Sequence, residues 1–344
     1  MSEQISIELE KLIMMAHSRG ASDLHLLAGE PPTIRVDGVL ERTGSAPLTA
    51  SETKAIASAV VSAEKIDAIE RDGGAVERSM TFGDVSARIC AARVSGGISI
   101  SVRLIPTIVP SVEMLRLPKG LIEAAKSPRG LIVCSGRIGS GKSTSAYGLL
   151  DHINATSNAN IHTLEDPILY RLTPKKSLVQ QREVGLDIPD TVTGLRQLIH
   201  MDPDVIFMSE VKTLEDLQAV ITTAETGHLV IVIMHADSPE EAIRRIGDVF
   251  PEHTRPFYRK ALADMIRCVS CQRLVPKIGG GRIAAFSVLV PDEEMRNAIA
   301  EGADIFSRRM PLPENCMRMA DEINRMACEG IISEETAKAY LADM

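Results

Sequence analysis

The sequence contains no tryptophan, and aromatic residues make up only 3% of its 344 positions. Basic residues are not in excess either, because 38 lysines and arginines against 46 acidic residues give a formal net charge of −8. Proteins that bind nucleic acids usually combine a basic surface with aromatic side chains on which bases stack. The composition therefore argues against that class, and we expect no nucleic-acid partner.

Long apolar runs are also missing. The longest strongly apolar run, Leu229–Met234, is far shorter than the roughly 18 residues that a membrane-spanning helix needs. The first eight residues have neither a basic start nor a continuous apolar segment, so they do not resemble a signal peptide. We therefore expect a soluble, cytoplasmic protein.

The six cysteines provide only one Cys-x-x-Cys pair, Cys268 and Cys271. A structural zinc site needs four ligands, normally two such pairs or one pair with nearby histidines. The residues flanking the pair lack the proline and glycine of a redox loop. Reduced, packed thiols are therefore the favoured interpretation, with a redox pair as the alternative.

The first part of the chain, residues 1–104, has the pattern of a small α+β domain. Apolar spacing predicts a helix over residues 5–18, and Asp37-Gly38 between apolar runs predicts a hairpin. A second helix is expected over residues 50–68, followed by strands over 79–104. Two prolines then suggest a linker, which we place at residues 105–112.

Beyond the linker, strands alternate with long helices over residues 113–290, which is typical of a parallel α/β sheet. Helices dominate the final segment, residues 291–344. One of them carries an apolar stripe that we interpret as core packing rather than a partner groove. Its members are Cys316, Met319, Ala320, Ile323, Met326 and Ala327.

A phosphate-binding motif lies at the start of this second part. Residues 136–143 satisfy G-x-x-x-x-G-K-[ST], with the strand Leu131–Cys134 before them and a helix after them. Backbone N–H groups of such a loop surround phosphates. Lys142 is expected to reach the β- and γ-phosphates of ATP, and the Ser143 hydroxyl to ligate Mg²⁺. The residues expected to hold the nucleotide are Gly136, Arg137, Ile138, Gly139, Ser140, Gly141, Lys142, Ser143 and Thr144.

Acidic residues follow two further strands. Glu165 and Asp166 end one apolar strand, and Glu210 ends another, as in a Walker B strand. The carboxyl ends of parallel strands lie at one edge of the sheet, so these acids are expected to converge near Lys142. Helix capping would explain any one of them, but not all three.

Two histidines, His228 and His235, stand at opposite ends of the buried strand Leu229–Met234. An isolated histidine in such a place is more often a satisfied core residue than a functional one. Here the neighbouring motifs make a γ-phosphate sensor or a relay between strands a second interpretation.

Taken together, these motifs resemble the secretion NTPase superfamily, and within it the PilT-type retraction ATPases of type IV pili. The resemblance runs through nearly the whole chain and includes four boxes in the family's order. The matching segments are Ala21–Leu26, Pro31–Gly38, Arg103–Pro106, the P-loop, Thr163–Pro167 (Asp box), Asp202–Glu210 (Walker B) and Ala224–His228 with His235 (His box).

This resemblance implies a PAS-like N-terminal domain and a RecA-like ATPase domain with a helical C-terminal segment. It implies a ring-shaped homohexamer that hydrolyses ATP with Mg²⁺ and acts at the inner membrane. Membrane contact would be made only through partners, namely a platform protein of a pilus machine and, in some systems, a second pilus ATPase. Pilus retraction is the expected activity, because extension motors usually carry an extra N-terminal domain and a four-cysteine module that are not found here.

The resemblance also implies residue roles. Glu165 would polarise the attacking water and Glu210 would bind Mg²⁺, directly or through water, although the two roles could be exchanged. His228 and His235 would sense the γ-phosphate. The arginines that would neutralise transition-state charge are Arg88, Arg103 and Arg196.

The chain departs from the family at several positions. Leu169 replaces an acid of the Asp box, and Lys212 and Thr213 replace an arginine and an aspartate after Glu210. Lysine keeps the charge but not the two-pronged geometry of arginine. An assembly or secretion ATPase, or a weakly catalytic accessory subunit that binds nucleotide, therefore remain alternatives to a retraction motor.

Overall fold

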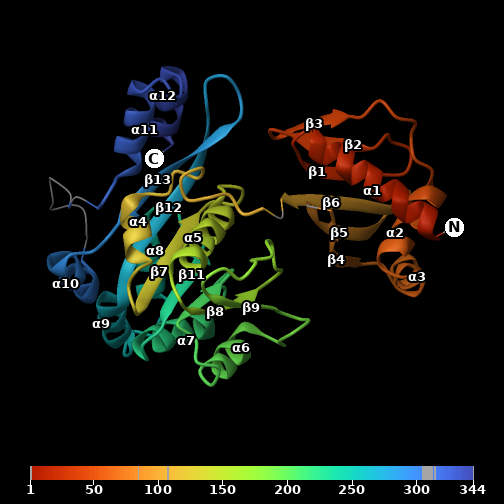
Figure 1. Cartoon of the computed structure of the whole chain (residues 1–344). Helices are drawn as coiled ribbons and strands as arrows, with labels where there is room; N and C mark the ends of the chain where they lie inside the picture. The colour runs from red at the N-terminus through yellow and green to blue at the C-terminus, as the bar shows by residue number, and fades with distance from the viewer. Residues whose placement is uncertain (1, 84, 107, 304–312, 314, 344) are drawn as a thin grey trace. The chain divides into compact units, whose positions relative to one another are not determined.

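The computed structural model describes residues 2–83, 85–106, 108–303, 313 and 315–343. The chain forms two compact units, Met1–Ile108 and Val109–Met344 (Figure 1). No helix among the described residues is both long and apolar enough to cross a membrane.

The N-terminal unit is a two-layer α+β structure. Its six strands form one antiparallel sheet in the order β3-β2-β1-β6-β5-β4. The elements are α1 (Ser2–Ser18), β1 (Ala21–Leu26), β2 (Thr33–Val36), β3 (Val39–Arg42), α2 (Ala50–Val60), α3 (Ala63–Asp72), β4 (Ala75–Phe82), β5 (Val85–Val94) and β6 (Gly97–Pro106).

Alternation along these strands separates a buried face from a polar one. In β5 the buried residues Ala87 and Ile89 alternate with Arg88, which points to the opposite face. All three helices contribute to the buried core, for example through Ile13, Ile56 and Ile66. The helices therefore lie on one face, and Arg88 lies on the face that they do not cover.

Of two local predictions in this unit, the structure confirms the hairpin and contradicts the single long helix. The Asp37-Gly38 hairpin is confirmed, and both residues have positive φ angles (47° and 87°), as a tight type I′ turn requires. The single helix over 50–68 is wrong, because the chain forms α2 and α3 with a break at Val61. Ser62 then accepts a hydrogen bond from the Lys65 backbone and caps the second helix.

The C-terminal unit is built on a seven-stranded sheet in the order β13-β12-β7-β11-β10-β8-β9, parallel except for β13. The elements are α4 (Lys119–Ala124), β7 (Gly130–Gly136), α5 (Lys142–Thr156), β8 (Asn160–Glu165), β9 (Leu178–Glu183), α6 (Thr191–Leu198), β10 (Val205–Met208), α7 (Leu214–Glu225), β11 (Leu229–Met234), α8 (Pro239–Asp248), α9 (Arg255–Met265), β12 (Ile266–Pro276), β13 (Arg282–Leu289), α10 (Glu293–Glu301), α11 (Met319–Cys328) and α12 (Glu334–Ala342).

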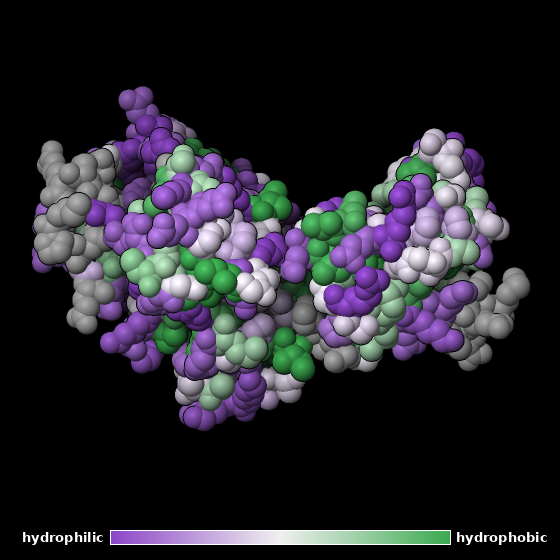
Figure 2. Space-filling view, turned by 90° about the horizontal axis from the view of Figure 1, so that it is seen from above, coloured by the Kyte–Doolittle hydropathy of each residue, from purple (hydrophilic) through white to green (hydrophobic). Residues whose placement is uncertain are grey.

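Helices cover both faces of this sheet (Figure 1). On one face, α6 to α10 pack over the apolar side chains of β7, β8, β10 and β11 in a single large core. On the other, Tyr147 of α5 contacts the ring of Phe207 on β10 edge-on, with centroids 5.5 Å apart. Polar residues make up most of the visible surface of this unit, with apolar residues in small groups between them (Figure 2).

The observed architecture confirms the predicted fold class, an α/β core preceded by a small α+β domain and followed by helices. The apolar stripe of the final segment is also confirmed as core, since Met319, Ile323 and Met326 are buried against Val275 and Ala285 of the β12–β13 hairpin.

All six cysteines are unpaired by disulfides, and Cys134, Cys268 and Cys271 are buried. Burial raises the pKa values of these thiols, to about 11 for Cys134 and Cys271. The prediction that all thiols are packed is wrong for Cys328, which is exposed near the end of α11.

Candidate functional site

The P-loop connects the carboxyl end of β7 to the start of α5. Gly136, Gly139 and Gly141 have φ angles of 150°, 77° and 82°, which L-residues rarely adopt. A Cβ atom on Gly136 would lie 2.5 Å from the Ser140 hydroxyl oxygen. The motif therefore needs its glycines for the path of the backbone as well as for access to phosphates.

Lys142 is the buried cation of this loop. It is only 8% exposed, and its ammonium donates to the carbonyl oxygen of Arg137 at 3.1 Å. Among the described residues, no carboxylate lies within ion-pair distance of it. Burial lowers the pKa of Lys142. The nearby Ser140 hydroxyl is also buried without a hydrogen-bond partner. A cation and a hydroxyl in this condition fit an anionic ligand such as a phosphate chain.

Three charged groups converge at the neighbouring strand ends. The Lys212 ammonium lies 3.0 Å from a carboxylate oxygen of Asp166 and 3.3 Å from one of Glu210. The other Glu210 oxygen lies 3.4 Å from Nε2 of His235. The hydrogen bond with Asp166 is the largest cause of the raised pKa of Lys212. The predicted convergence of acids at this edge therefore includes Asp166 and Glu210, held together by a lysine.

Glu165 has a different environment. Its side chain is fully buried, and one oxygen accepts hydrogen bonds from Thr163 and, at 2.9 Å, from Gln181. The other oxygen is buried without a hydrogen-bond partner. Burial is the largest cause that raises the pKa of Glu165 to about 8. Glu165 is thus a buried acid with a raised pKa, whereas Glu210 is partly exposed beside Lys212 and His235.

The two histidines lie at opposite ends of β11, a central strand of the sheet. β7 and β11 are parallel, with Leu229 opposite Gly130 and Met234 opposite Ser135. His235 therefore follows β11 at the end nearer the P-loop. His228 precedes β11, and the six residues of that strand separate the two histidines by about 20 Å. The ring of His228 contacts the Thr223 carbonyl. His228 is therefore remote from the P-loop of its own chain, and its role as a γ-phosphate sensor stays a prediction.

The three predicted arginines are dispersed. Arg88 and Arg103 are neighbours across β5 and β6 in the N-terminal unit, where they pair with Glu77 and Asp23. Arg196 lies on the exposed side of α6 in the C-terminal unit. The first two form intra-unit ion pairs that the sequence pattern did not predict.

A cavity of about 340 Å³ adjoins the P-loop. Gly141 and Thr144 form part of its wall, together with Leu274 and the cations Arg116, Lys277 and Arg282. Its apolar and basic lining is suited to a ligand with a flat ring system and negative charge. Sequence analysis missed this wall, because its residues come from three separate segments without a motif.

Sequence analysis also missed how two family departures are used. Lys212 joins the two carboxylates, as described above. Thr213 caps α7, accepting a hydrogen bond from the Asp216 backbone while Asp216 accepts one from the Thr213 backbone. The S/T-x-x-D spacing of a capping box was the available signal for the second of these.

A glycine-rich loop between a parallel strand and a helix, with acids at the adjacent strand ends, defines a P-loop nucleotide-binding protein. Comparison with known proteins narrows this class. The sequence model of the type II/IV secretion system protein family matches residues 2–280, and the chain belongs to that family.

Two PilT comparisons cover nearly the whole chain. The type IV pilus retraction ATPase PilT of Pseudomonas aeruginosa is 34% identical over 96% of this chain and 97% of its own length. A crystal structure of the retraction motor PilT with bound ADP superposes with a TM-score of 0.86, 34% identity and 96% coverage of both chains. The ATPase DotB of Legionella pneumophila superposes with a TM-score of 0.85, at 26% identity over 98% of this chain and 96% of its own. The predicted membership of the secretion NTPase superfamily is thereby confirmed, and the chain is an ATPase of that superfamily.

Proposed function

We propose that this protein is a Mg²⁺-dependent ATPase motor that drives retraction of a type IV pilus. The observation that carries the proposal is the site at the carboxyl edge of the sheet, where the buried cation Lys142 and the cluster of Asp166, Glu210, Lys212 and His235 end neighbouring strands. The near full-length likeness to PilT supports the direction of movement.

The residues present fit ATP and Mg²⁺. Backbone N–H groups of the P-loop and the Lys142 ammonium would bind the phosphates, and the adjoining cavity would take the base and ribose. The Ser143 hydroxyl and the Glu210 carboxylate would hold Mg²⁺, directly or through water, because hard cations prefer oxygen ligands. When bound, Mg²⁺ neutralises charge on the phosphates.

Within this site we assign Glu210 as the carboxylate that orients the attacking water. It is 32% exposed and contacts His235, whereas Glu165 is fully buried. The water-orienting role, which the resemblance first gives to Glu165, thus passes to Glu210 in addition to its role at Mg²⁺. Glu165 then supports the strand end by its hydrogen bonds with Thr163 and Gln181. His235 would report on the γ-phosphate through its contact with Glu210.

In this proposal, six copies of the chain form a ring that docks on a platform protein at the inner membrane. The composition is neither basic nor rich in aromatic residues, which supports a protein cargo rather than a nucleic acid. In such a ring, Arg88, Arg103 and Arg196 are the candidates for neutralising charge at a site shared between copies.

The proposal is tested by deleting the gene and counting surface pili by electron microscopy. Cells without the protein should carry more pili than wild-type cells, because assembly continues while removal stops. Wild-type protein should restore the normal number and Lys142→Ala should not, since the phosphates lose their buried cation. Bald cells would indicate an assembly motor, and normal restoration by Lys142→Ala would indicate an accessory subunit; both results overturn the proposal.

A further inference from the structure

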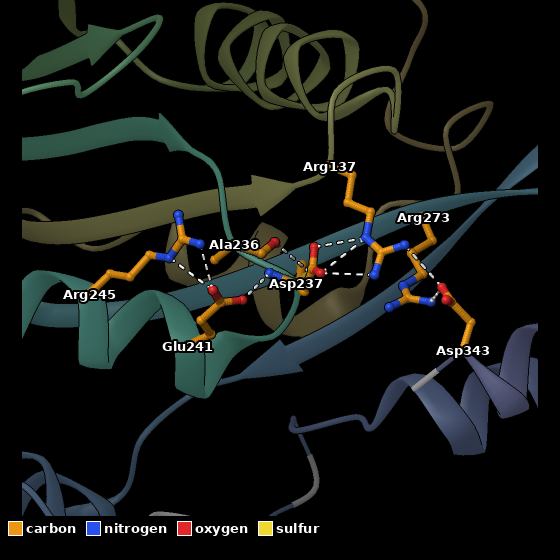
Figure 3. Close-up of polar contacts among 8 residues, drawn as sticks. Arg137, Ala236, Asp237, Glu241, Arg245, Arg273 and Asp343 are labelled. Atoms are coloured by element: carbon orange, nitrogen blue, oxygen red, sulfur yellow. Dashed lines mark hydrogen bonds and ion pairs between the residues drawn. The ribbon is translucent and has the colours of Figure 1, made fainter.

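Arg137, a variable position of the P-loop motif, connects the loop to two distant parts of the C-terminal unit (Figure 3). Its Nε and Nη2 atoms lie 2.9 to 3.0 Å from both carboxylate oxygens of Asp237, which follows β11. Its Nη1 atom lies 3.0 Å from Asp343, just beyond the end of α12. One guanidinium therefore joins the P-loop, the loop after His235 and the last described helix.

Both partners of Arg137 belong to further contacts. Asp343 also lies 3.0 Å from Arg273 of β12. The Asp237 backbone N–H donates to Glu241 of α8 at 2.6 Å, and Glu241 in turn pairs with Arg245. Figure 3 shows these side chains in a row between α8 and α12. The hydrogen bonds to Arg137 are the largest cause of the lowered pKa of Asp237.

The backbone of Arg137 is tied to the catalytic lysine. Its carbonyl oxygen accepts the Lys142 ammonium at 3.1 Å and the Ser140 N–H at 3.2 Å. A phosphate chain bound in the loop would compete with this carbonyl for the ammonium, because a charged acceptor forms the stronger hydrogen bond. Binding of phosphate therefore changes the hydrogen bonding of the Arg137 backbone, and the side chain of the same residue contacts Asp343.

We propose that Arg137 is a positioning residue that couples nucleotide binding at the P-loop to the docking of α12. Bound nucleotide would fix the loop, hold the Arg137 guanidinium against Asp343 and strengthen docking of the helix. The inference rests on nucleotide binding at the P-loop, as proposed above. The nucleotide state of the site would thus set how firmly α12 is docked, and through α12 it would affect any surface that the helix contacts.

Docking of α12 does not depend on Arg137 alone. The Tyr340 hydroxyl donates to the Leu274 carbonyl at 2.9 Å, and Ala337 belongs to the core formed with β12 and β13. Arg137, Asp237 and Asp343 are about half exposed, so an isolated pair of this kind would contribute little to stability. Removing Asp343 should consequently loosen the coupling without unfolding the helix.

Coupling between two events is reciprocal: if helix docking tightens nucleotide binding by some factor, nucleotide tightens docking by the same factor. The test is therefore hydrogen–deuterium exchange of α12 with and without Mg·ADP, combined with ADP affinity and ATP turnover. In the wild-type protein, saturating Mg·ADP should slow exchange of α12 by about threefold or more. In Asp343→Asn and Arg137→Gln this change should fall below about 1.5-fold, and ADP should bind about threefold more weakly.

Two further variants separate coupling from a merely structural role. Asp237→Asn keeps the Arg137–Asp343 contact, so the response of α12 to nucleotide should persist. Lys338→Gln removes the exposed pair with Glu334 on the same helix, a pair that includes neither Arg137 nor Asp343, and should behave as wild type. For Asp343→Asn, the KM for ATP should rise by about threefold while kcat stays within twofold, because the reacting groups are untouched.

The proposal is overturned if wild-type protein binds Mg·ADP without any change in exchange of α12. It is also overturned if Asp343→Asn retains the full response, or if Lys338→Gln loses it equally. A wild-type protein that binds no nucleotide would instead contradict the proposed ATPase function, so the two failures are distinguishable.

Discussion

Glu210→Gln is expected to lower kcat for ATP hydrolysis at least about hundredfold, while ADP affinity changes by less than about threefold. The amide keeps the size of the side chain but cannot accept a proton or orient water with a negative charge, effects that typically contribute 10² or more to the rate. Removing the charge also frees Lys212 from one of its two carboxylate partners. The measurement is steady-state phosphate release with a parallel binding titration.

Two further variants serve as controls for Glu210→Gln. Lys142→Ala should lose both binding and turnover, since the phosphates lose their only buried cation at the loop among the described residues. Glu215→Gln, on the exposed first turn of α7, should match the wild type. A Glu210→Gln protein with kcat within threefold of wild type would show that another group, with Glu165 the first candidate, orients the water.

Glu165→Gln is expected to stabilise the protein at alkaline pH and to have little effect at pH 5. The folded state raises the pKa of Glu165 from 4.5 to about 8, so the folded state holds the proton more tightly than the unfolded chain. The unfolded chain therefore releases this proton first, so the stability of the folded state falls as pH rises from 4.5 to about 8, and the loss is complete above pH 8. Gln mimics the neutral acid and avoids this cost, so Tm at pH 8.5 should be higher than wild type by about 5 °C or more.

The control for this comparison is Glu225→Gln, an exposed change at the end of α7 that should leave Tm unchanged at both pH values. Equal Tm values for wild type and Glu165→Gln from pH 5 to pH 8.5 would mean that Glu165 ionises freely. Glu165 would then be accessible as a base, contrary to its buried position.

Much of the fold follows from local sequence signals. The Asp37-Gly38 turn, the strand before the P-loop and the buried strand between the two histidines were predictable, because their signals lie within a few residues. The break between α2 and α3 was not, since Ser62 acts as an N-cap inside an otherwise helical pattern. The order of the strands in the sheet also depends on contacts between distant segments.

The candidate site likewise contains residues that local motifs predict and contacts that only the folded chain creates. Lys142, Ser143 and Glu210 could be identified because their motifs have fixed spacing. The burial of Glu165 and its hydrogen bond with Gln181 of a neighbouring strand depend on contacts between distant segments, and the position of His228 depends on strand direction. The contact of Arg137 with Asp343 spans 206 positions, so no local pattern could reveal it.

The most direct test of the central claim is time-lapse imaging of fluorescently labelled pili in a deletion strain that expresses either wild-type protein or Glu210→Gln. Retraction events should occur with the wild-type protein and be lost with Glu210→Gln, while new pili continue to extend in both strains. Retraction at the normal frequency with Glu210→Gln, or failure of extension in the deletion strain, would contradict an ATP-driven retraction motor.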